Sequence, residues 1–208
     1  MEDQERIDLF NELNSKKKKK KRGFHLPGLL TTILIALILS VLFSTFVIQV
    51  RLVSGKSMIP TLQDGDKCIV SRCSYLFSKP DYNDIVILDS RVDRTHTIKD
   101  DFLDVLSHNA ITSFFTGNSS NEHVYFIKRV VGLPGDKISF SKGKLVRNDE
   151  VIEEPYVYER ILKNPTETVV VPEGYVYVLG DNRNDSKDSR QLGCIPYSNI
   201  IGKTIYTF

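Results

Sequence analysis

The sequence is poor in cysteine, with three in 208 residues, at positions 68, 73 and 194. Their number is odd, no pair has Cys-x-x-Cys spacing, and none is spaced with histidine as zinc ligands are. This argues against a structural zinc site and against a disulfide-rich secreted scaffold. We interpret the three as small, buried thiols, and the sequence leaves a Cys68–Cys73 bridge open.

Basic and acidic residues nearly balance over most of the chain. Residues 51–208 carry 20 Lys or Arg and 21 Asp or Glu, whereas residues 1–50 carry eight basic and five acidic residues, which gives the net charge of +2. A balanced domain has no broad cationic face for phosphates, so we expect no nucleic-acid partner, and a membrane surface fits better. The length suits one compact domain with an attachment.

The one long hydrophobic run covers residues 29–50, which include no charge. As a helix, this run would cross the roughly 30 Å hydrocarbon core at about 1.5 Å per residue. It is longer than the core of a cleavable signal peptide, and Val50–Val53 offers no small-x-small cleavage site, so we expect a permanent membrane helix. Six lysines and an arginine at 16–22 bias the preceding end to the cytoplasm.

The sequence therefore predicts a single-pass protein of the cell membrane. Its parts would be a cytoplasmic basic tail (1–28), an anchor (29–50) that contacts membrane lipid, and an extracytoplasmic domain (51–208). Nothing in the sequence specifies an oligomeric state.

The outer domain has short runs of β-branched and aromatic residues, separated in several places by Gly-Asp turns. These features predict a mainly antiparallel β domain. The expected strands are 67–70, 85–88, 124–131, 137–140, 144–147, 168–171, 175–179 and 200–206. Within the excursion 97–121, helical spacing as far as residue 115, with Thr97 and Asp100 placed like a capping box, predicts a short amphipathic helix.

Ser57 lies in the segment SGKSMIPT (Ser54–Thr61), which glycine and proline bound. Such a segment can expose a hydroxyl and aim the N–H of the serine at a developing oxyanion, although it is more often simply a loop.

A nucleophilic serine needs a base, and the four histidines are badly placed to supply one. His25 precedes the hydrophobic run, His96 and His108 lie in or beside the excursion, and only His123 adjoins an expected core strand.

Lys128 is the alternative base. In the strand 124–131 it shares a face with Val124, Phe126 and Val130, because alternate residues of a strand point to the same side. A hydrocarbon environment would lower the pKa of its amine, while the rival interpretation is a lysine that extends outward from an edge strand. Arg129 points to the other face, where it is a candidate partner in an ion pair.

A polar loop, GDNRNDSKDSR (Gly180–Arg190), follows an apolar strand. A calcium loop is excluded by its spacing, because Arg183 takes a ligand position, and by the lack of the central glycine and the closing glutamate. A hydrogen-bonded loop with internal Asp–Arg pairs fits better. It is either purely structural or supports a site, with Asp181 among the supporting residues.

Three segments occur in this order after a hydrophobic run: SGKSMIPT, KRVVGLPGD and GDNRNDSKDSR. Because of these three segments together, the chain resembles type I signal peptidases. The resemblance implies a signal-peptidase-like domain of several coiled antiparallel sheets and a serine endopeptidase that removes signal peptides from exported preproteins. It implies that Ser57 is the nucleophile, that Lys128 is the general base and that Ser186 orients the lysine amine. It also implies a supporting ion pair between Asp188 and Arg190, and neither a metal nor an organic cofactor.

The resemblance further implies a peptide substrate that docks as an added β-strand, with small side chains in two shallow pockets and with Met58 and Ile59 among its contacts. Gly55 replaces a serine that donates to the oxyanion in relatives from two-membrane bacteria, so the pattern is similar to the Gram-positive branch and the Ser57 N–H is the one donor that we name. Two alternatives are a self-cleaving Ser–Lys repressor and a non-catalytic accessory protein of surface-fibre assembly. The hydrophobic run opposes the first, and the presence of both Ser57 and Lys128 opposes the second.

Overall fold

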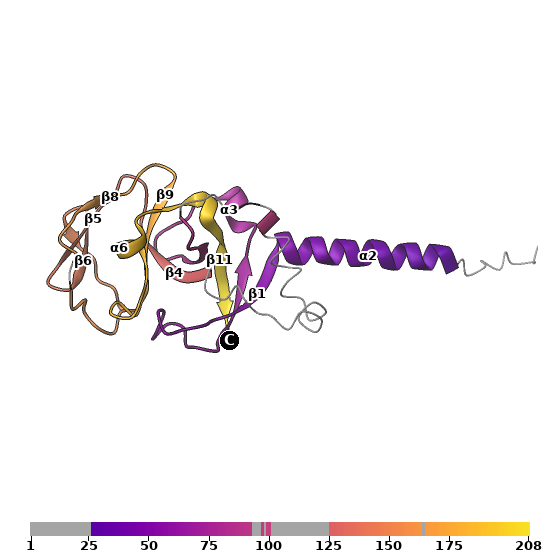
Figure 1. The fold of residues 1–208 in the computed structure, drawn as a ribbon, viewed down its shortest axis with the longest axis horizontal. Helices are drawn as coiled ribbons and strands as arrows, with labels where there is room; N and C mark the ends of the chain where they lie inside the picture. The colour runs from indigo at the N-terminus through magenta and orange to yellow at the C-terminus, as the bar shows by residue number, and fades with distance from the viewer. Residues whose placement is uncertain (1–25, 93–96, 98, 101–124, 164) are drawn as a thin grey trace, which may run out of the picture. The chain divides into compact units, whose positions relative to one another are not determined.

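The computed structural model describes residues 26–92, 97, 99–100, 125–163 and 165–208. The chain divides into two compact units, residues 1–41 and 42–208. Helix α2 (Leu26–Phe46) supplies the described part of the first unit (Figure 1). None of the described helices has both the length and the hydropathy that crossing a membrane requires.

The hydrophobic run does not form one element, which corrects the predicted boundary at residue 50. The helix ends at Phe46, and residues 48–50 belong to strand β1 (Ile48–Leu52). Apolar side chains at 48, 50 and 52 alternate there with Gln49 and Arg51, a period of two that suits a strand. Pairing with β2, from Ile48 opposite Ser71 to Leu52 opposite Lys67, fixes this conformation.

A seven-stranded antiparallel sheet forms the larger part of the domain, in the order β1-β2-β11-β3-β4-β9-β10. The strands after β1 are β2 (Lys67–Ser71), β11 (Ile200–Thr207), β3 (Ile85–Asp89), β4 (Tyr125–Gly132), β9 (Tyr175–Leu179) and β10 (Ile195–Pro196). Strand β11 comes last in chain order, yet it lies between β2 and β3.

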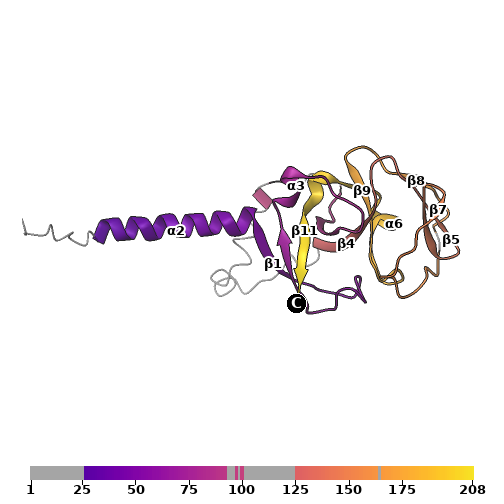
Figure 2. The same ribbon diagram turned by 180° about the vertical axis from the view of Figure 1, so that it is seen from behind.

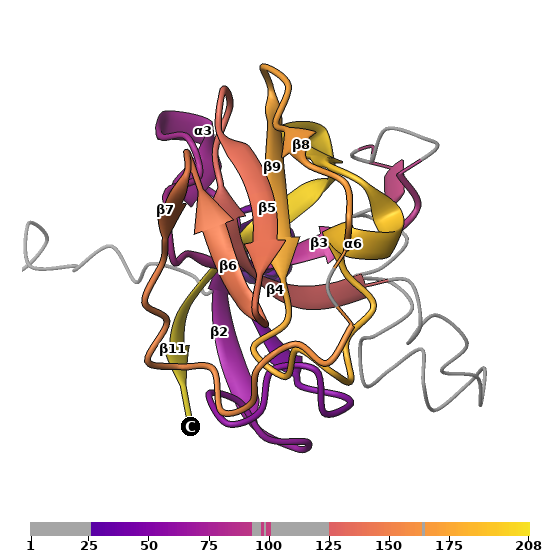
Figure 3. The same ribbon diagram turned by 90° about the vertical axis from the view of Figure 1, so that its left-hand side faces the viewer.

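A second sheet of four strands has the order β7-β6-β5-β8. Its strands are β5 (Lys137–Ser141), β6 (Lys144–Arg147), β7 (Glu150–Val151) and β8 (Val169–Val170). Figures 1 and 2 place this sheet at the end of the β domain away from β1, and Figure 3 shows it face on. Three short helices complete the description: α3 (Ser74–Phe77), α6 (Ser189–Leu192) and the 3₁₀ helix η1 (Tyr197–Asn199).

Three apolar clusters hold the sheets together. The first joins the segment after β1 to β2, β3 and β11, and it includes Val53, Met58 and Leu62. The second is built on β3, β4 and β9, and the third packs the four-stranded sheet against Tyr177 and Leu179. The mainly β class is therefore observed, and the clusters fix the segments on both sides of Ser57 and Lys128.

The eight predicted strands all correspond to observed strands within about two residues at each end, apart from residue 124, which lies outside the described residues. Most of the predicted helix at 97–115 also lies outside them. At the predicted start of this helix, Thr97 N–H donates to Asp100 Oδ2 at 2.9 Å, which is the backbone contact of a capping box. All three cysteines are free, so Cys68 and Cys73 form no bridge.

Candidate active site

Ser57 lies in a turn between β1 and β2, and the neighbours of the turn anchor it in the core. Met58 and Leu62 are almost fully buried, and Leu62 N–H donates to the Met58 carbonyl at 2.9 Å. Gly55 has a φ of +95°, in the left-handed region that favours glycine, and its N–H donates to Asp64 Oδ1. The chain therefore enters the turn through a glycine and leaves it through buried side chains, which leaves Ser57 half-buried.

Lys128 reaches Ser57 from the middle of β4. Its Nζ lies 2.7 Å from Ser57 Oγ and also donates to the Ile127 carbonyl at 2.9 Å. The residue is only 3% exposed, and Nζ lies 5.2 Å from the centre of the Phe126 ring. The two residues are 71 positions apart in the sequence, and the apolar cluster that packs Met58 and Leu62 with Ile127 of β4 brings the turn beside the strand.

The electrostatics of Lys128 follow from its burial. Loss of water around the amine lowers its pKa from 10.5 to about 8, which outweighs the opposing effect of the negative charges of Asp188 and Asp181, while Arg190 lowers it further. About a tenth of such amines are neutral at pH 7, compared with well under a thousandth for an unperturbed lysine. The sequence prediction of a lysine in a hydrocarbon environment matches this geometry.

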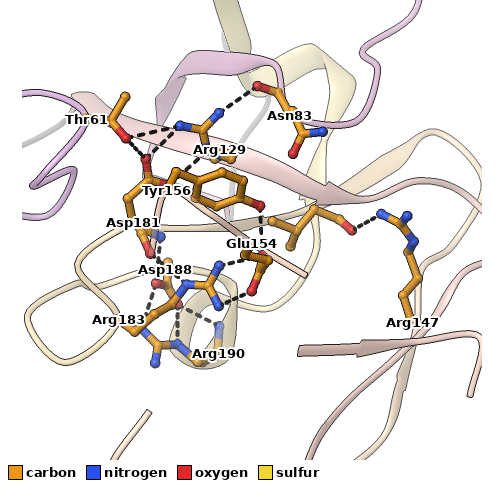
Figure 4. Close-up of polar contacts among 12 residues, drawn as sticks. Thr61, Asn83, Arg129, Arg147, Glu154, Tyr156, Asp181, Arg183, Asp188 and Arg190 are labelled. Carbon is orange, nitrogen blue, oxygen red and sulfur yellow. Dashed lines mark hydrogen bonds and ion pairs between the residues drawn. The ribbon is translucent and has the colours of Figure 1, made fainter. Parts of the chain in front are cut away.

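Arg129, the next residue, points to the opposite side and forms a buried ion pair with Asp181 (Figure 4). Its Nε donates to Asp181 Oδ1 at 2.9 Å and its Nη2 to Oδ2 at 2.7 Å. Thr61 donates its hydroxyl to the same carboxylate. Burial acts to lower the pKa of Arg129, but Asp181 raises it overall. This pair thus ties together the turn that holds Ser57, the strand that holds Lys128 and the start of the polar loop.

A second ion pair closes the polar loop internally, as predicted for this segment. Arg190 Nε and Nη2 each donate to one oxygen of Asp188 at 2.8 Å, and the Asp188 side chain is fully buried. Asp188 Oδ2 also accepts from Gly180 N–H at 3.0 Å. The first and last residues of the loop are therefore held on the same carboxylate.

A third pair was not identified from the sequence. Arg183 donates to both oxygens of Glu154, at 2.8 and 2.6 Å, and the two side chains are nearly fully buried. Tyr156 donates its hydroxyl to Glu154, and its ring lies 3.9 Å below the guanidinium of Arg129. Burial raises the pKa of Tyr156, and the charge of Glu154 adds to the effect. In the sequence, the indication of this pair is Arg183 itself, because an arginine of the polar loop without a partner inside the loop needs an acidic residue elsewhere.

Two predicted residues, Ser186 and Met58, lie differently from the expectation. Ser186 has its Oγ buried without a hydrogen-bond partner, and the described contacts of the Lys128 amine do not include it. Met58 is a core residue with 1% exposure rather than an open contact surface, while Ile59 is half-buried. Among the residues that the structure describes, no three His, Cys, Asp or Glu side chains lie together as a metal site would require.

Known proteins resemble this chain along most of its length. Thylakoidal processing peptidase 1, chloroplastic, of Arabidopsis thaliana is 36% identical over 83% of this chain and 45% of that protein. Signal peptidase I of Bacillus caldolyticus is 30% identical over 92% of this chain and 93% of that protein. A crystal structure of a signal peptidase I from Enterococcus faecalis V583 aligns with 62% of this chain and 98% of that chain, at 23% identity and a TM-score of 0.42.

This chain spans less than half the length of the two chloroplastic relatives, but nearly all of the Bacillus one. A family model described as "Signal peptidase, peptidase S26" matches residues 27–208. With a match of that extent, the chain belongs to the signal peptidase family, peptidase S26.

Proposed function

We propose that this protein is a membrane-bound signal peptidase I that removes N-terminal signal peptides from exported preproteins. The observation that carries the proposal is the 2.7 Å contact between Ser57 Oγ and the buried Lys128 amine, whose pKa is lowered to about 8. A hydroxyl beside a neutral amine is a nucleophile beside its base, which is the arrangement that acyl transfer needs.

In the proposed reaction, neutral Lys128 accepts the Ser57 proton while Oγ attacks the carbonyl carbon of the scissile bond. The oxygen of that carbonyl becomes an oxyanion, to which the Ser57 N–H donates. Collapse breaks the C–N bond, the lysine returns the proton to the leaving amine, and the mature protein departs. Water, activated by the same amine, then releases the signal peptide from Ser57.

The edge of β4 supports docking of the substrate as a strand. Strand β3 pairs with β4 from Tyr125 to Arg129, whereas on the other side the register with β9 starts only at Arg129. Phe126–Lys128 therefore faces no strand on the β9 side within the described part of the chain. An extended peptide at this edge would bring its backbone past Ser57, with alternate side chains directed at the protein.

Membrane attachment is part of the proposal on sequence grounds. Residues 29–46 form an uncharged helical segment, and the seven consecutive basic residues at 16–22 precede it. Protease added to intact protoplasts should degrade a tag at the C-terminus and spare one at the N-terminus. The opposite result would reverse the proposed orientation.

The activity is tested with the full chain in lipid and a purified preprotein, with the new N-terminus mapped by mass spectrometry. Ser57→Ala, Lys128→Ala and Lys128→Arg should each remove nearly all cleavage, because guanidinium stays protonated and cannot replace the amine. The Ser57–Lys128 double variant should lose little more than either single one. Lys144→Ala is the matched control, since this half-exposed lysine pairs with Glu153 on the small sheet. Substantial activity of either Lys128 variant would contradict the proposed base.

A further inference from the structure

The start of the polar loop lies directly against the nucleophile turn. At Gly180, an added Cβ would fall 2.6 Å from the Ser57 carbonyl oxygen and 2.2 Å from Ser186 Oγ, which is closer than atoms approach without displacement. Glycine is therefore required for this contact between two backbones. The next residue, Asp181, accepts from Thr61, so the loop also holds the exit of the turn.

Asn182, the third residue of the loop, binds two successive carbonyls of the turn, those of Lys56 and Ser57. Its backbone N–H donates to the Ser57 carbonyl at 3.0 Å, and its side-chain Nδ2 donates to the Lys56 carbonyl at 3.1 Å. The Lys56 carbonyl also accepts from Ile59 N–H at 3.2 Å, within the turn itself. The Asn182 amide is thus the contact that connects this carbonyl to another part of the protein.

The orientation of the Lys56 carbonyl determines the orientation of the Ser57 N–H. Both belong to one planar peptide unit, which is trans here, so they point in opposite directions. A hydrogen bond accepted by the carbonyl also polarises the unit and strengthens the N–H as a donor. In the described part of the chain the Ser57 N–H itself has no acceptor, which leaves it available to a ligand.

The restraint from the loop matters at this position, because the N-terminal side of the turn is exposed and the bond from Gly55 N–H to Asp64 does not fix the Lys56 carbonyl. Ser54, Gly55 and Lys56 are all exposed, and Gly55 has the wide conformational freedom of glycine. Without the Asn182 amide, the Lys56 carbonyl would keep the 3.2 Å bond from Ile59 N–H but lose its restraint from the polar loop, and the Lys56–Ser57 peptide unit would have more freedom to rotate about its flanking bonds. The Ser57 hydroxyl would remain beside Lys128, but the direction of the N–H would be less well defined.

We propose that Asn182 is a positioning residue that aims the Ser57 N–H at the oxyanion. The inference rests on the proposed function, and it names a residue that acts on the transition state without touching Lys128. Removal of an oxyanion donor lowers kcat by about 10²–10³, so loss of its orientation should lower kcat by about 10- to 100-fold. KM should stay within about twofold, because the oxyanion is absent from the bound substrate.

The test compares Asn182→Ala and Asn182→Asp with the wild-type full chain in detergent, using a cleavable peptide. The Asp variant keeps the size and the backbone N–H but cannot donate from its side chain, so it tests the same bond if the Ala variant folds poorly. Asn184→Ala is the matched control, because this neighbouring asparagine bonds Leu162 N–H and the Arg160 carbonyl instead of the turn. Thermal unfolding checks that each variant is folded.

The second readout is the affinity for a peptide aldehyde. Ser57 Oγ adds to the aldehyde carbon, the serine proton passes to Lys128, and the former carbonyl oxygen takes the place of the oxyanion. Affinity should fall in proportion to kcat in both Asn182 variants, and the pH midpoint of the Ala variant should not move, because alanine introduces no charge near Lys128.

Two results would overturn the inference: a kcat within twofold of wild type in both Asn182 variants, or a lower kcat with unchanged aldehyde affinity. A cleaving Ser57→Ala protein would instead overturn the proposed function, so the two failures are distinguishable.

Discussion

The rate of peptide cleavage should follow a single ionisation near pH 8, which is that of Lys128. Burial removes water from the amine and lowers its pKa from 10.5 to about 8, against the raising effect of Asp188 and Asp181. In the proposed reaction only the neutral amine can accept the Ser57 proton. The activity should therefore belong to the deprotonated form and rise with pH.

The expected size of this rise follows from the two pKa values. With a pKa of about 8, the neutral fraction is about 10% at pH 7, about half at pH 8 and about 90% at pH 9. The kcat/KM should increase about tenfold between pH 7 and pH 9 and then level. With an ordinary lysine pKa, the neutral fraction would increase about 100-fold over the same interval and would continue to rise.

The assay is a quenched fluorescent peptide with alanine at the first and third positions before the cut, measured from pH 6 to 10 with substrate well below KM. Under this condition the profile reports the free enzyme. Unfolding measured at each pH separates ionisation of the site from loss of the fold. A profile that does not level by pH 9.5, or that is flat from pH 6 to 8, would refute the assignment of a buried amine as the base.

The same ionisation also makes the free energy of unfolding depend on pH. The folded protein releases the lysine proton near pH 8 and the unfolded chain near 10.5, so the unfolded chain binds more protons between these values. The free energy of unfolding should therefore rise with pH across this window, by roughly 3 kcal/mol in total. Lys128→Met, which has no charge to bury, should lack the rise.

Three further results are expected. Arg190→Gln should shift the activity midpoint to higher pH, because it removes a cation that lowers the Lys128 pKa and leaves the Asp188 charge uncompensated; an unchanged midpoint would exclude this coupling. Glu154→Gln should lower the free energy of unfolding by about 3 kcal/mol in denaturant titrations, since Arg183 keeps a buried charge without its partner, and a change below about 0.5 kcal/mol would contradict that burial. Peptides with Phe or Leu before the cut should be cleaved far more slowly than those with Ala, and equal rates would refute the shallow pockets.

Periodicity was sufficient to predict the central strands and the surroundings of Lys128. In β4, alternation alone placed Lys128 and Arg129 on opposite faces, and the structure has one beside Ser57 and the other on Asp181. That argument works because a strand has a period of two, whatever its neighbours are.

Other features depend on contacts that no local pattern contains. Strand β1 follows α2 without any polar residue to separate them until Gln49, so hydropathy could not mark the change from helix to strand. Strands β7 and β10 have two residues each, too few for a period. The partner of Arg183 is 29 residues away in an irregular segment, and only the folded chain brings Glu154 to it.

The place of β11 in the larger sheet has a consequence for when the protein can act. This strand, the last in chain order, pairs with β2 on one side and with β3 on the other, and Lys128 lies on β4, beyond β3. Before residues 200–207 are available, the two halves of the sheet have no strand between them. A chain still under synthesis would thus hold Ser57 and Lys128 in parts of the sheet that no strand pairing joins, and we expect the Ser57–Lys128 contact to form fully only after residues 200–207 have been synthesised.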